Sequence, residues 1–579
     1  EELAEMYVNT EKGVVTTSDA ISGALDIIAE EISDNAEYRK SIREMFYKHG
    51  FIVSQAKKEE DSVYRMYYDY REPLTGIAGH RVLAMNRGEK EEFLNVKIEV
   101  PEEKIIDYLK QKILKGRKSI FDVLIEQAVE DSCKRLIFPS VEREVRNELT
   151  EVAEEKAMKV FAQNLKNLLL QPPVRGKVVL GLDPAYRTGC KIAVVDEKGD
   201  VLDTAVIYPT PPQNKIAEAK EIMKNLIEKH NVSIISIGNG TASKEAEIFT
   251  AELLKELDKK VYYMVVSEAG ASVYSASKLG AEEFPEYDVS LRSAVSIARR
   301  LQDPLAELVK IDPKAIGVGQ YQHDMNQKKL GETLKAVVED CVNSVGVDLN
   351  TASWSLLSYI SGINSAVAKN IVEYRQKNGK FKSRDELKKV KKLGEKVFEQ
   401  CAGFLRIPDG DNILDNTSVH PESYDAVNEL LRITGYTLED VRNKNIKDLP
   451  KKVEEIGVEK VAQLIGTGVP TLMDIIEELK KPGRDPRDEL PKPMLQTEIL
   501  DIKDLKPGMV MTGTVRNVAD FGAFVDIGVH QDGLVHISEL SERFVRNPMD
   551  IVSVGDIVKV RILDVDVERK RISLSMKQV

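Results

Sequence analysis

The chain has 579 residues, too many for a single hydrophobic core, so several domains are expected. Its formal net charge of −12 argues against a general polyanion-binding protein, and any contact with nucleic acid has to come from local basic patches. The four cysteines are far apart and lack the paired spacing of a metal site, which predicts reduced and mostly buried thiols. No apolar run is long enough to span a bilayer and no signal peptide opens the chain, so we expect a cytoplasmic protein without a membrane partner.

Residues 1–172 have mostly helical apolar spacing. Ser18 is the expected cap of a helix that continues to about Ile32, and a second amphipathic stretch covers residues 119–170. One short strand is expected between them, at residues 94–100. The chain starts without a methionine, inside a helix-like stretch. We therefore expect an incomplete, helix-turn-helix-containing scaffold that lacks an N-terminal part.

The periodicity changes to that of strands after Pro172-Pro173, and residues 173–325 predict an α/β domain. Three consecutive strands come first, in KVVLGLDPA, CKIAVVD and VLDTAVIYP, and helices then alternate with two more, in VSIISIGNG and VYYMVVSEAG. This order is typical of the ribonuclease-H-like fold, and GLDPAYRTG resembles its Holliday-junction-resolvase branch, the YqgF-like group. Active members of that fold use carboxylates to hold two metal ions that activate water.

The carboxylates that such a metal site needs are incomplete in this sequence. Asp183 takes the first position and Glu268 is available after the fifth strand, but the fourth strand ends in Gly-Asn-Gly where a second acid is expected. The neutral amide of Asn239 is a poor ligand for Mg²⁺. The next helix offers Leu, Arg or Ser at positions 291–293 instead of an acid. We therefore expect a degenerate, non-catalytic domain without metal or cofactor; the alternative is a metal-dependent, structure-selective nuclease.

Residues 326–407 contain two helix-hairpin-helix patterns, the second weaker, with Lys392 where its first glycine would be. A glycine turn lets backbone N–H groups approach a phosphate at a helix N-terminus. Twelve Lys and Arg against five Asp and Glu lie between residues 365 and 406. The block predicts contact with a sugar-phosphate backbone; the alternative is a solvated basic face around a packing hairpin. The backbone-contact candidates are Gly362, Ile363, Asn364, Lys369, Gly394 and Lys396.

A second helical domain is expected at residues 408–482, followed by a linker rich in proline and charge at 483–504 and a small antiparallel barrel at 505–579. The barrel's alternating strands include residues 515–518, 523–527, 533–537 and 557–565.

Two aromatic residues, Phe521 and Phe524, lie just ahead of and within the barrel's second strand, His536 follows on the third, and Arg571 lies on the last. Flat rings on a strand face beside a guanidinium form a platform for unstacked bases. The words DFGAFV and GLVHIS closely resemble the S1-type OB fold, an RNA-binding barrel. The alternative is that both phenylalanines are ordinary barrel core.

The order of these modules resembles the bacterial Tex family of transcription accessory proteins over essentially the whole chain. The resemblance rests on YREPLTGIAGHRVLAMNRGE, GLDPAYRTGCKIAVVD, IGNGTASKEAE and KKLGEKVFEQCAGFLRI. It implies a cytoplasmic protein that binds nucleic acid chiefly through the S1 domain. One departure is Ala185, which replaces the usual glycine of the first-strand motif. The residues that match the RNA-contacting surface of S1 domains are Phe521, Phe524, His536, Asp566 and Arg571.

The expected architecture is multidomain and mainly α, with one α/β ribonuclease-H-like domain and a C-terminal all-β OB barrel. The expected function is non-catalytic binding of single-stranded RNA, with DNA as a second ligand, next to the transcription or translation apparatus. A third alternative is an interaction scaffold in which helical faces bind RNA polymerase or the ribosome. No phosphate-loop motif occurs, and no small-molecule substrate is evident.

Overall fold

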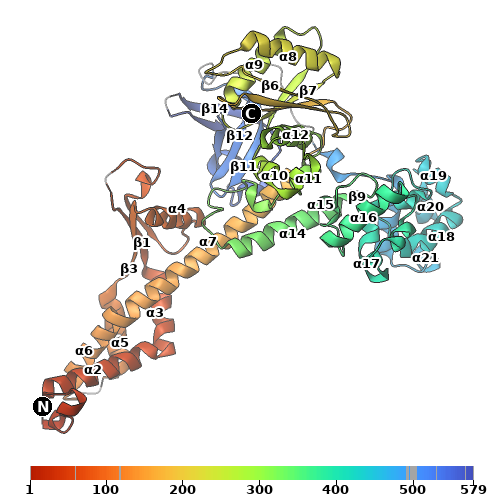
Figure 1. Ribbon diagram of the computed structural model, residues 1–579. Coiled ribbons are helices and arrows are strands. Elements are labelled where there is room, and N and C mark those ends of the chain that lie inside the picture. The colour runs from red at the N-terminus through yellow and green to blue at the C-terminus, as the bar shows by residue number, and fades with distance from the viewer. Residues whose placement is uncertain are drawn as a thin grey trace. The chain divides into compact units, whose positions relative to one another are not determined.

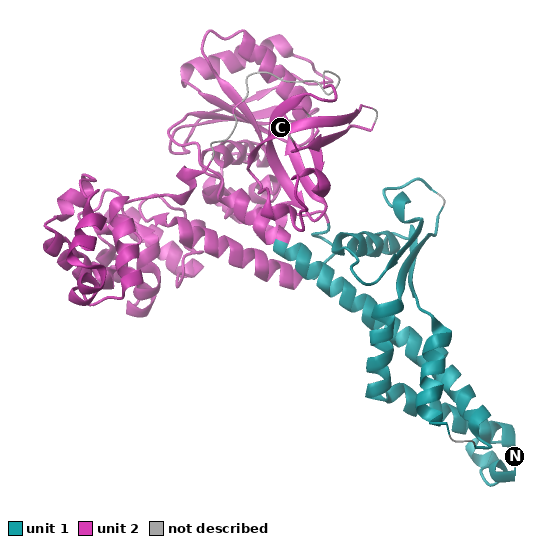
Figure 2. Cartoon of the chain, turned by 180° about the vertical axis from the view of Figure 1, so that it is seen from behind, with its two compact units in different colours: residues 1–159, 321–326 teal, residues 160–320, 327–579 magenta. Residues whose placement is uncertain are grey.

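The computed structural model describes residues 2–58, 60–116, 119–490, 495, 505–529, 531–567, 569–577 and 579. The chain divides into two compact units (Figure 2), the first of residues 1–159 and 321–326 and the second of residues 160–320 and 327–579. All four cysteines are free and buried, as the sequence predicts. Within the described ranges, no helix combines the length and the apolar character that crossing a membrane requires.

The first unit is mainly helical, as expected, but it contains a sheet that the sequence shows only in part. Its helices are α1 (Glu2–Glu5), α2 (Thr17–Asp34), α3 (Ala36–His49), α4 (Gly79–Lys90), α5 (Glu102–Leu114), α6 (Asp122–Asp131) and most of α7 (Phe138–Leu169). An antiparallel sheet of order β2-β1-β3 is formed by β1 (Phe51–Ala56), β2 (Asp69–Pro73) and β3 (Leu94–Glu99). Only β3 is evident from the sequence pattern.

The cap of α2 differs from the sequence expectation. The hydroxyl of Thr16 accepts the N–H of Asp19, and the Asp19 carboxylate accepts the N–H of Thr16, which completes a capping box. Ser18 lies inside the first turn of the helix. The expected cap at Ser18 is therefore wrong, because Asp19 stands three residues after Thr16 and supplies the reciprocal bond.

The α/β domain of the second unit has a five-stranded sheet of order β6-β5-β4-β7-β8. Its strands are β4 (Val179–Asp183), β5 (Cys190–Val195), β6 (Val201–Ile207), β7 (Ile234–Gly238) and β8 (Tyr262–Val266). The first three pair antiparallel, while β4, β7 and β8 run parallel. The sequence predicts these five strands and their order along the chain, three in succession and then two that alternate with helices, but not their order within the sheet.

Helices cover both faces of this sheet (Figure 1). On one face, α8 (Ile216–Lys229) and α9 (Ser243–Lys255) pack on Leu180 and Leu182, and on the other α12 (Val289–Gln302) packs on Val179. The contact with α12 is close at Gly181, where an added Cβ would lie 2.2 Å from the carbonyl oxygen of Ala294. Shorter helices of the domain are α10 (Ala271–Ala276), α11 (Lys278–Glu283) and α13 (Pro304–Leu308).

Two helical domains follow in the second unit. The first contains α14 (Gln327–Val345), α15 (Trp354–Leu357), α16 (Ser365–Asn378) and α17 (Glu395–Cys401), and its ends meet where β9 (Val347–Asp348) pairs with β10 (Leu405–Arg406). The second contains α18 (Tyr424–Thr434), α19 (Leu438–Arg442), α20 (Leu449–Ile456), α21 (Val458–Leu464) and α22 (Val469–Lys480) around its own core. Of the expected linker, residues 491–494 and 496–504 lie outside the described residues.

The C-terminal part is a closed barrel of order β11-β12-β13-β15-β14, which confirms the expected OB architecture. Its strands are β11 (Val510–Ala519), β12 (Gly522–Asp526), β13 (Gly533–His536), β14 (Ile557–Asp566) and β15 (Arg571–Ser575). Side chains alternate along each strand, so Ala523 and Val525 of β12 face the core, as do Ile572 and Leu574 of β15.

Candidate nucleic-acid interface

The two phenylalanines of the barrel lie outside its core. The buried cluster is aliphatic and contains neither Phe521 nor Phe524, although both are only partly exposed. Their ring centroids are 6.1 Å apart and the ring planes are nearly perpendicular, at 89°. An edge-to-face arrangement of this kind is one of the preferred geometries of aromatic pairs, and it orients the two rings relative to each other.

His536 lies at the same end of the barrel as Phe521. In the register of β12 and β13, Gly522 is paired with His536 and Phe524 with Leu534. The imidazole is exposed, and its Nδ1 lies 2.9 Å from the Ser538 hydroxyl. The structure therefore gathers three of the five expected RNA-contacting residues, Phe521, Phe524 and His536.

Asp566 and Arg571 form a second group at the opposite end of the strands. They are paired in the register of β14 and β15, and Arg571 is exposed. The Asp566 carboxylate accepts the N–H of Arg569 at 2.9 Å, so it stabilises the turn before β15. The parallel register of β13 with β15 starts at Leu534 and Ser573, which separates Arg571 from His536 along the strand direction.

The two helical hairpins have matching backbone geometry. Gly362 has φ +79° and Lys392 has φ +66°, so the lysine occupies the left-handed conformation of the glycine that it replaces. The next residue donates its N–H back into the turn in both copies, Ile363 to Ile360 and Leu393 to Val390. The Ile363 side chain is also buried. Of the first turn, Ser361, Gly362 and Asn364 are the exposed positions.

Both hairpins lead into a helix. The Asn364 side chain caps α16 by accepting the N–H of Val367, whereas Gly394 begins α17 without a side-chain cap. Open space surrounds the Cα of Gly394, since no atom lies within 4 Å of an added Cβ. The first turn of α17 is therefore accessible to a ligand beside the exposed Lys396.

The basic residues of this block divide into two kinds. All nine lysines between residues 365 and 406 are exposed, at positions 369, 377, 380, 382, 388, 389, 391, 392 and 396. The three arginines instead donate to backbone carbonyls: Arg375 to Leu349, Arg384 to Leu405, and Arg406 to Gly403. The charge available to a phosphate backbone therefore comes from lysine, and we call these nine residues the lysine face.

The expected catalytic carboxylates lie at the carboxyl ends of the parallel strands. The pKa of Asp183 is raised to about 6, mainly because the carboxyl group is buried. A hydrogen bond from Ser293 lowers this pKa, and the nearby charge of Glu268 raises it. Ser293 projects from α12, the element from which a further acid would have to come. The amide oxygen of Asn239 accepts the Glu268 N–H at 3.0 Å.

The residue Glu268 follows β8, and its carboxylate lies against the turn after β7. Added Cβ atoms at Gly238 and Gly240 would lie 2.6 Å and 1.6 Å from its carboxylate oxygens, so the two glycines make room for it. Burial raises the Glu268 pKa, opposed by a bond from the Gly240 N–H, and its Oε2 is buried without a hydrogen-bond partner. No group of three or more His, Cys, Asp or Glu that could hold a metal ion occurs in the part of the chain that the structure describes.

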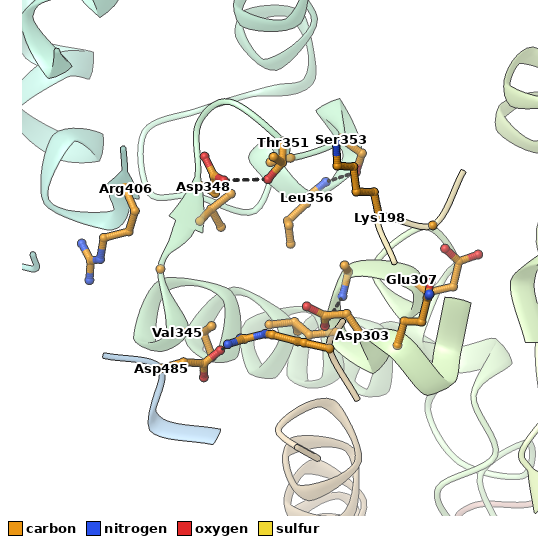
Figure 3. A pocket seen from close by; sticks show the side chains of 18 of the residues that line it. Lys198, Asp303, Glu307, Val345, Asp348, Thr351, Ser353, Leu356, Arg406 and Asp485 are labelled. Atoms are coloured by element: carbon orange, nitrogen blue, oxygen red, sulfur yellow. Dashed lines mark hydrogen bonds and ion pairs between the residues drawn. The ribbon is translucent and has the colours of Figure 1, made fainter. Parts of the chain in front are cut away.

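A polar cleft of about 660 Å³ lies between the α/β domain and the first helical domain (Figure 3). Its wall includes Lys198 from the β5–β6 turn, Asp303 between α12 and α13, and Asp348, whose carboxylate accepts the Thr351 hydroxyl at 2.9 Å. None of the residues expected from the sequence to bind nucleic acid or metal lines this cleft. The charged residues of the cleft come from segments far apart in the chain, so no local sequence motif predicts it.

The segment 483–489, which we call the strap, closes one side of this cleft. Arg487 is 3% exposed, and its guanidinium lies 2.8 Å from carboxylate oxygens of both Asp303 and Asp485. Arg175 also pairs with Asp485. The strap therefore fixes the end of the second helical domain to the α/β domain. The sequence signal for it is the alternating charge of RDPRDE.

The barrel also contacts the α/β domain and the end of α7. The side-chain amide of Asn164 donates to the Asn517 side chain at 2.8 Å and to the Val518 carbonyl at 3.0 Å. Arg516 pairs with Asp526 and reaches the carbonyl oxygen of Val265 on β8. Strand β11 thus forms the docked side, and the expected ring platform lies on the neighbouring strand β12.

Protein-family models match most of the chain. They are Tex central region-like at residues 1–161, Tex protein YqgF-like domain at 177–302, helix-hairpin-helix motif at 342–406, HHH domain at 412–487 and S1 RNA binding domain at 504–577.

Several curated proteins are similar over nearly the whole chain. YdcI of Bacillus subtilis is 54% identical over 99% of this chain and 80% of its own length. The transcriptional accessory protein Tex of Neisseria gonorrhoeae is 47% identical over 100% of this chain and 76% of its own. The protein tex of Bordetella pertussis is 46% identical over 99% and 74%. The resemblance inferred from the sequence motifs is confirmed, and the chain belongs to the Tex family.

Proposed function

We propose that this protein is a non-catalytic accessory factor of transcription that binds single-stranded RNA on the outer face of its S1 barrel. The observation that carries the proposal is the pair Phe521 and Phe524, whose rings lie outside the aliphatic core next to the exposed His536. Bases without a partner strand stack on such rings irrespective of sequence. The transcriptional role is taken from the name of the Neisseria relative.

The lysine face supplies a second, weaker contact in this proposal. One small barrel offers a short stacking surface, while the lysine face attracts phosphates without reading bases. Both belong to the second compact unit, so a strand long enough to reach both gains affinity through effective concentration. Double-stranded or single-stranded DNA can occupy the lysine face by the same electrostatics.

The test is an RNA-binding titration with the double substitution Phe521→Ala and Phe524→Ala in the full chain. Each lost stacking contact is worth about 1–3 kcal/mol, so we expect affinity for a single-stranded RNA to fall by well over tenfold at fixed salt. Leu563→Ala is the matched control, because Leu563 is an apolar residue of the same barrel that is 44% exposed. Unchanged affinity in the double variant, with a normal circular-dichroism spectrum, would refute the proposal.

We also propose that the YqgF-like domain does not cleave nucleic acid. Ser293 and Asn239 are neutral at positions where the fold would need acids, and this leaves Asp183 and Glu268 without the charge that two Mg²⁺ ions require. Purified protein should leave branched DNA and single-stranded RNA intact in Mg²⁺ or Mn²⁺. Cleavage that Asp183→Asn abolishes would establish the nuclease alternative, whereas cleavage that survives this substitution would come from a contaminant.

The remaining alternative is a scaffold in which the helical domains bind RNA polymerase or the ribosome in the cytoplasm. It is distinguished by co-purification from cells that express the wild type or the Phe521/Phe524 double variant. If RNA binding is the primary activity, the wild type retains RNA that the double variant loses. If the scaffold alternative holds, the wild type and the double variant co-purify with the same protein partner and have the same effect in cells.

A further inference from the structure

A third aromatic ring of the barrel, Phe544, is not explained by the fold. It belongs to the segment 541–547, which follows the short helix η11 (Ile537–Glu539) at the end of β13. Its side chain is 91% exposed, the highest value for a large apolar side chain in the described ranges. Exposing a whole phenyl ring to water forfeits the free energy of burying it. A functional contact is therefore the natural explanation to test.

The segment around Phe544 is anchored by other residues. Leu540 is 2% exposed in the barrel core, Val545 packs against that core, and Pro548 is buried. The Ser541 hydroxyl accepts the N–H of Arg543 at 3.2 Å. The inward positions are thus filled by aliphatic side chains on either side of Phe544. Phe544 is therefore not a displaced core residue, because other side chains already fill the inward positions of this segment.

The topology places the residues just before this segment next to the expected RNA platform. The N–H of Ile537 donates to the carbonyl oxygen of Phe521 at 2.8 Å, and Gly522 pairs with His536 one residue earlier. The chain therefore leaves the barrel from the end where Phe521 and His536 lie. Arg571, by contrast, lies at the other end of the strands.

The charges beside Phe544 match a nucleic-acid strand. Arg543 and Arg546 flank the ring and are both exposed, with Glu542 as the single acid of the segment 541–547. A guanidinium contacts phosphate oxygens in two directions and also stacks on bases. A ring between two arginines therefore offers the same two contacts, stacking and phosphate binding, that define single-strand sites.

We infer that Phe544, with Arg543 and Arg546, forms a second nucleotide subsite that extends the RNA track beyond Phe521 and His536. The inference rests on the proposed function, since it names further contacts of the same strand. A base stacks on the Phe544 ring, and the two guanidiniums bind the phosphates on either side of that nucleotide. A short oligonucleotide contacts only Phe521, Phe524 and His536, whereas a longer one also reaches Phe544.

The experiment compares Phe544→Ala with wild type on two oligouridylates of about 5 and about 12 nucleotides, which lie within the range of single OB-fold sites. In the full chain at fixed salt, we expect affinity for the longer probe to fall about tenfold and affinity for the shorter one to stay within twofold. Phe544→Leu keeps an apolar side chain without a π face and should lose as much as Phe544→Ala. Phe544→Trp keeps a π face and should bind the longer probe as tightly as the wild type does.

The outcomes separate this inference from the proposed function. If the Phe521/Phe524 double variant loses RNA and Phe544→Ala binds both probes like wild type, the second subsite is refuted and the proposed function stands. If the double variant still binds both probes, the proposed function fails first. An equal loss of both probes in Phe544→Ala refutes a separate subsite, and a loss of protein partners alone assigns the ring to a protein contact.

Discussion

Asp183 illustrates how burial alters a single carboxyl group in the degenerate site. Its folded-state pKa of about 6 lies above the ordinary value of 3.8, so the folded protein binds a proton more tightly than the unfolded chain. The unfolding free energy therefore falls as pH rises from about 4 to about 6, and the cost of the buried charge is fully present above pH 6. We predict that Asp183→Asn raises the melting temperature at pH 8 and has little effect near pH 4.

Glu197→Gln provides the control for this substitution. Glu197 is an exposed carboxylate on the β5–β6 turn of the same domain, and neutralising it should leave the melting temperature nearly unchanged at both values of pH. A stabilisation by Asp183→Asn that is equally large at pH 4 and pH 8 would show that the ionised carboxylate is not the source of the effect.

The two hairpins make a prediction at the scale of elements. Gly362 and Lys392 share a positive φ, and an added Cβ at Gly362 would lie 2.8 Å from the Cβ of Gln400. Because left-handed backbone costs a residue with a Cβ about 1 kcal/mol, Gly362→Ala should destabilise the domain and Lys392→Gly should stabilise it. Trp354, the one tryptophan of the sequence, lies in α15 of this domain and reports its denaturation by fluorescence.

Lys391→Gly is the control for the stabilising substitution. Lys391 is also exposed but does not have a positive φ, so glycine there only adds freedom to the unfolded chain and should lower the denaturation midpoint. The reasoning would be wrong if Lys392→Gly lowered the midpoint as much as Lys391→Gly does.

Elements with a clear local period could be predicted from the sequence, and elements made by distant partners could not. The apolar runs of β4 and β7 predict buried strands, and the glycine at position 362 predicts a turn. Strand β2, in contrast, is the polar Asp69–Pro73, which becomes a strand only through its pairing with β1. A sequence pattern sees neighbours along the chain, whereas this pairing joins segments on either side of a long connection.

The same limit applies to the candidate sites. Arg384 counts as a basic residue in the sequence, but it is 1% exposed and donates to backbone carbonyls such as that of Val419. Charge alone does not tell an arginine that fills a core from one that faces a phosphate. For the barrel, the alternation within DFGAFV shows where Phe524 points, but the exposure of Phe544 depends on Val545 taking the inward position.

At the scale of the whole second unit, the strap determines how rigidly the helical domains are joined to the α/β domain. Removing Arg487 would take from the buried Asp485 carboxylate the guanidinium that it shares with the partly exposed Asp303. Breaking a fully buried ion pair typically costs about 3–5 kcal/mol, and the cost here should be smaller because Asp485 still pairs with Arg175 and Asp303 reaches solvent. We predict that Arg487→Ala detaches the strap, so that trypsin cleaves after Lys480 or Arg484 much faster than in the wild type; the Lys481–Pro482 bond is resistant to trypsin.

The detached strap should also change RNA binding in a length-dependent manner. A fixed spacing between the lysine face and the barrel raises the effective concentration of the second site once the first is occupied. Arg487→Ala should therefore weaken binding of RNA longer than the roughly 16 nucleotides that one OB fold covers, and leave short RNA unaffected. Lys481→Ala is the matched control, because Lys481 pairs with the exposed Glu489 and its substitution removes no trypsin site, and exposed ion pairs contribute only about 0–1 kcal/mol. Equal weakening of short and long RNA by Arg487→Ala would mean that the substitution damages the barrel itself. A proteolysis rate equal to that of Lys481→Ala would mean that the strap is held by other contacts.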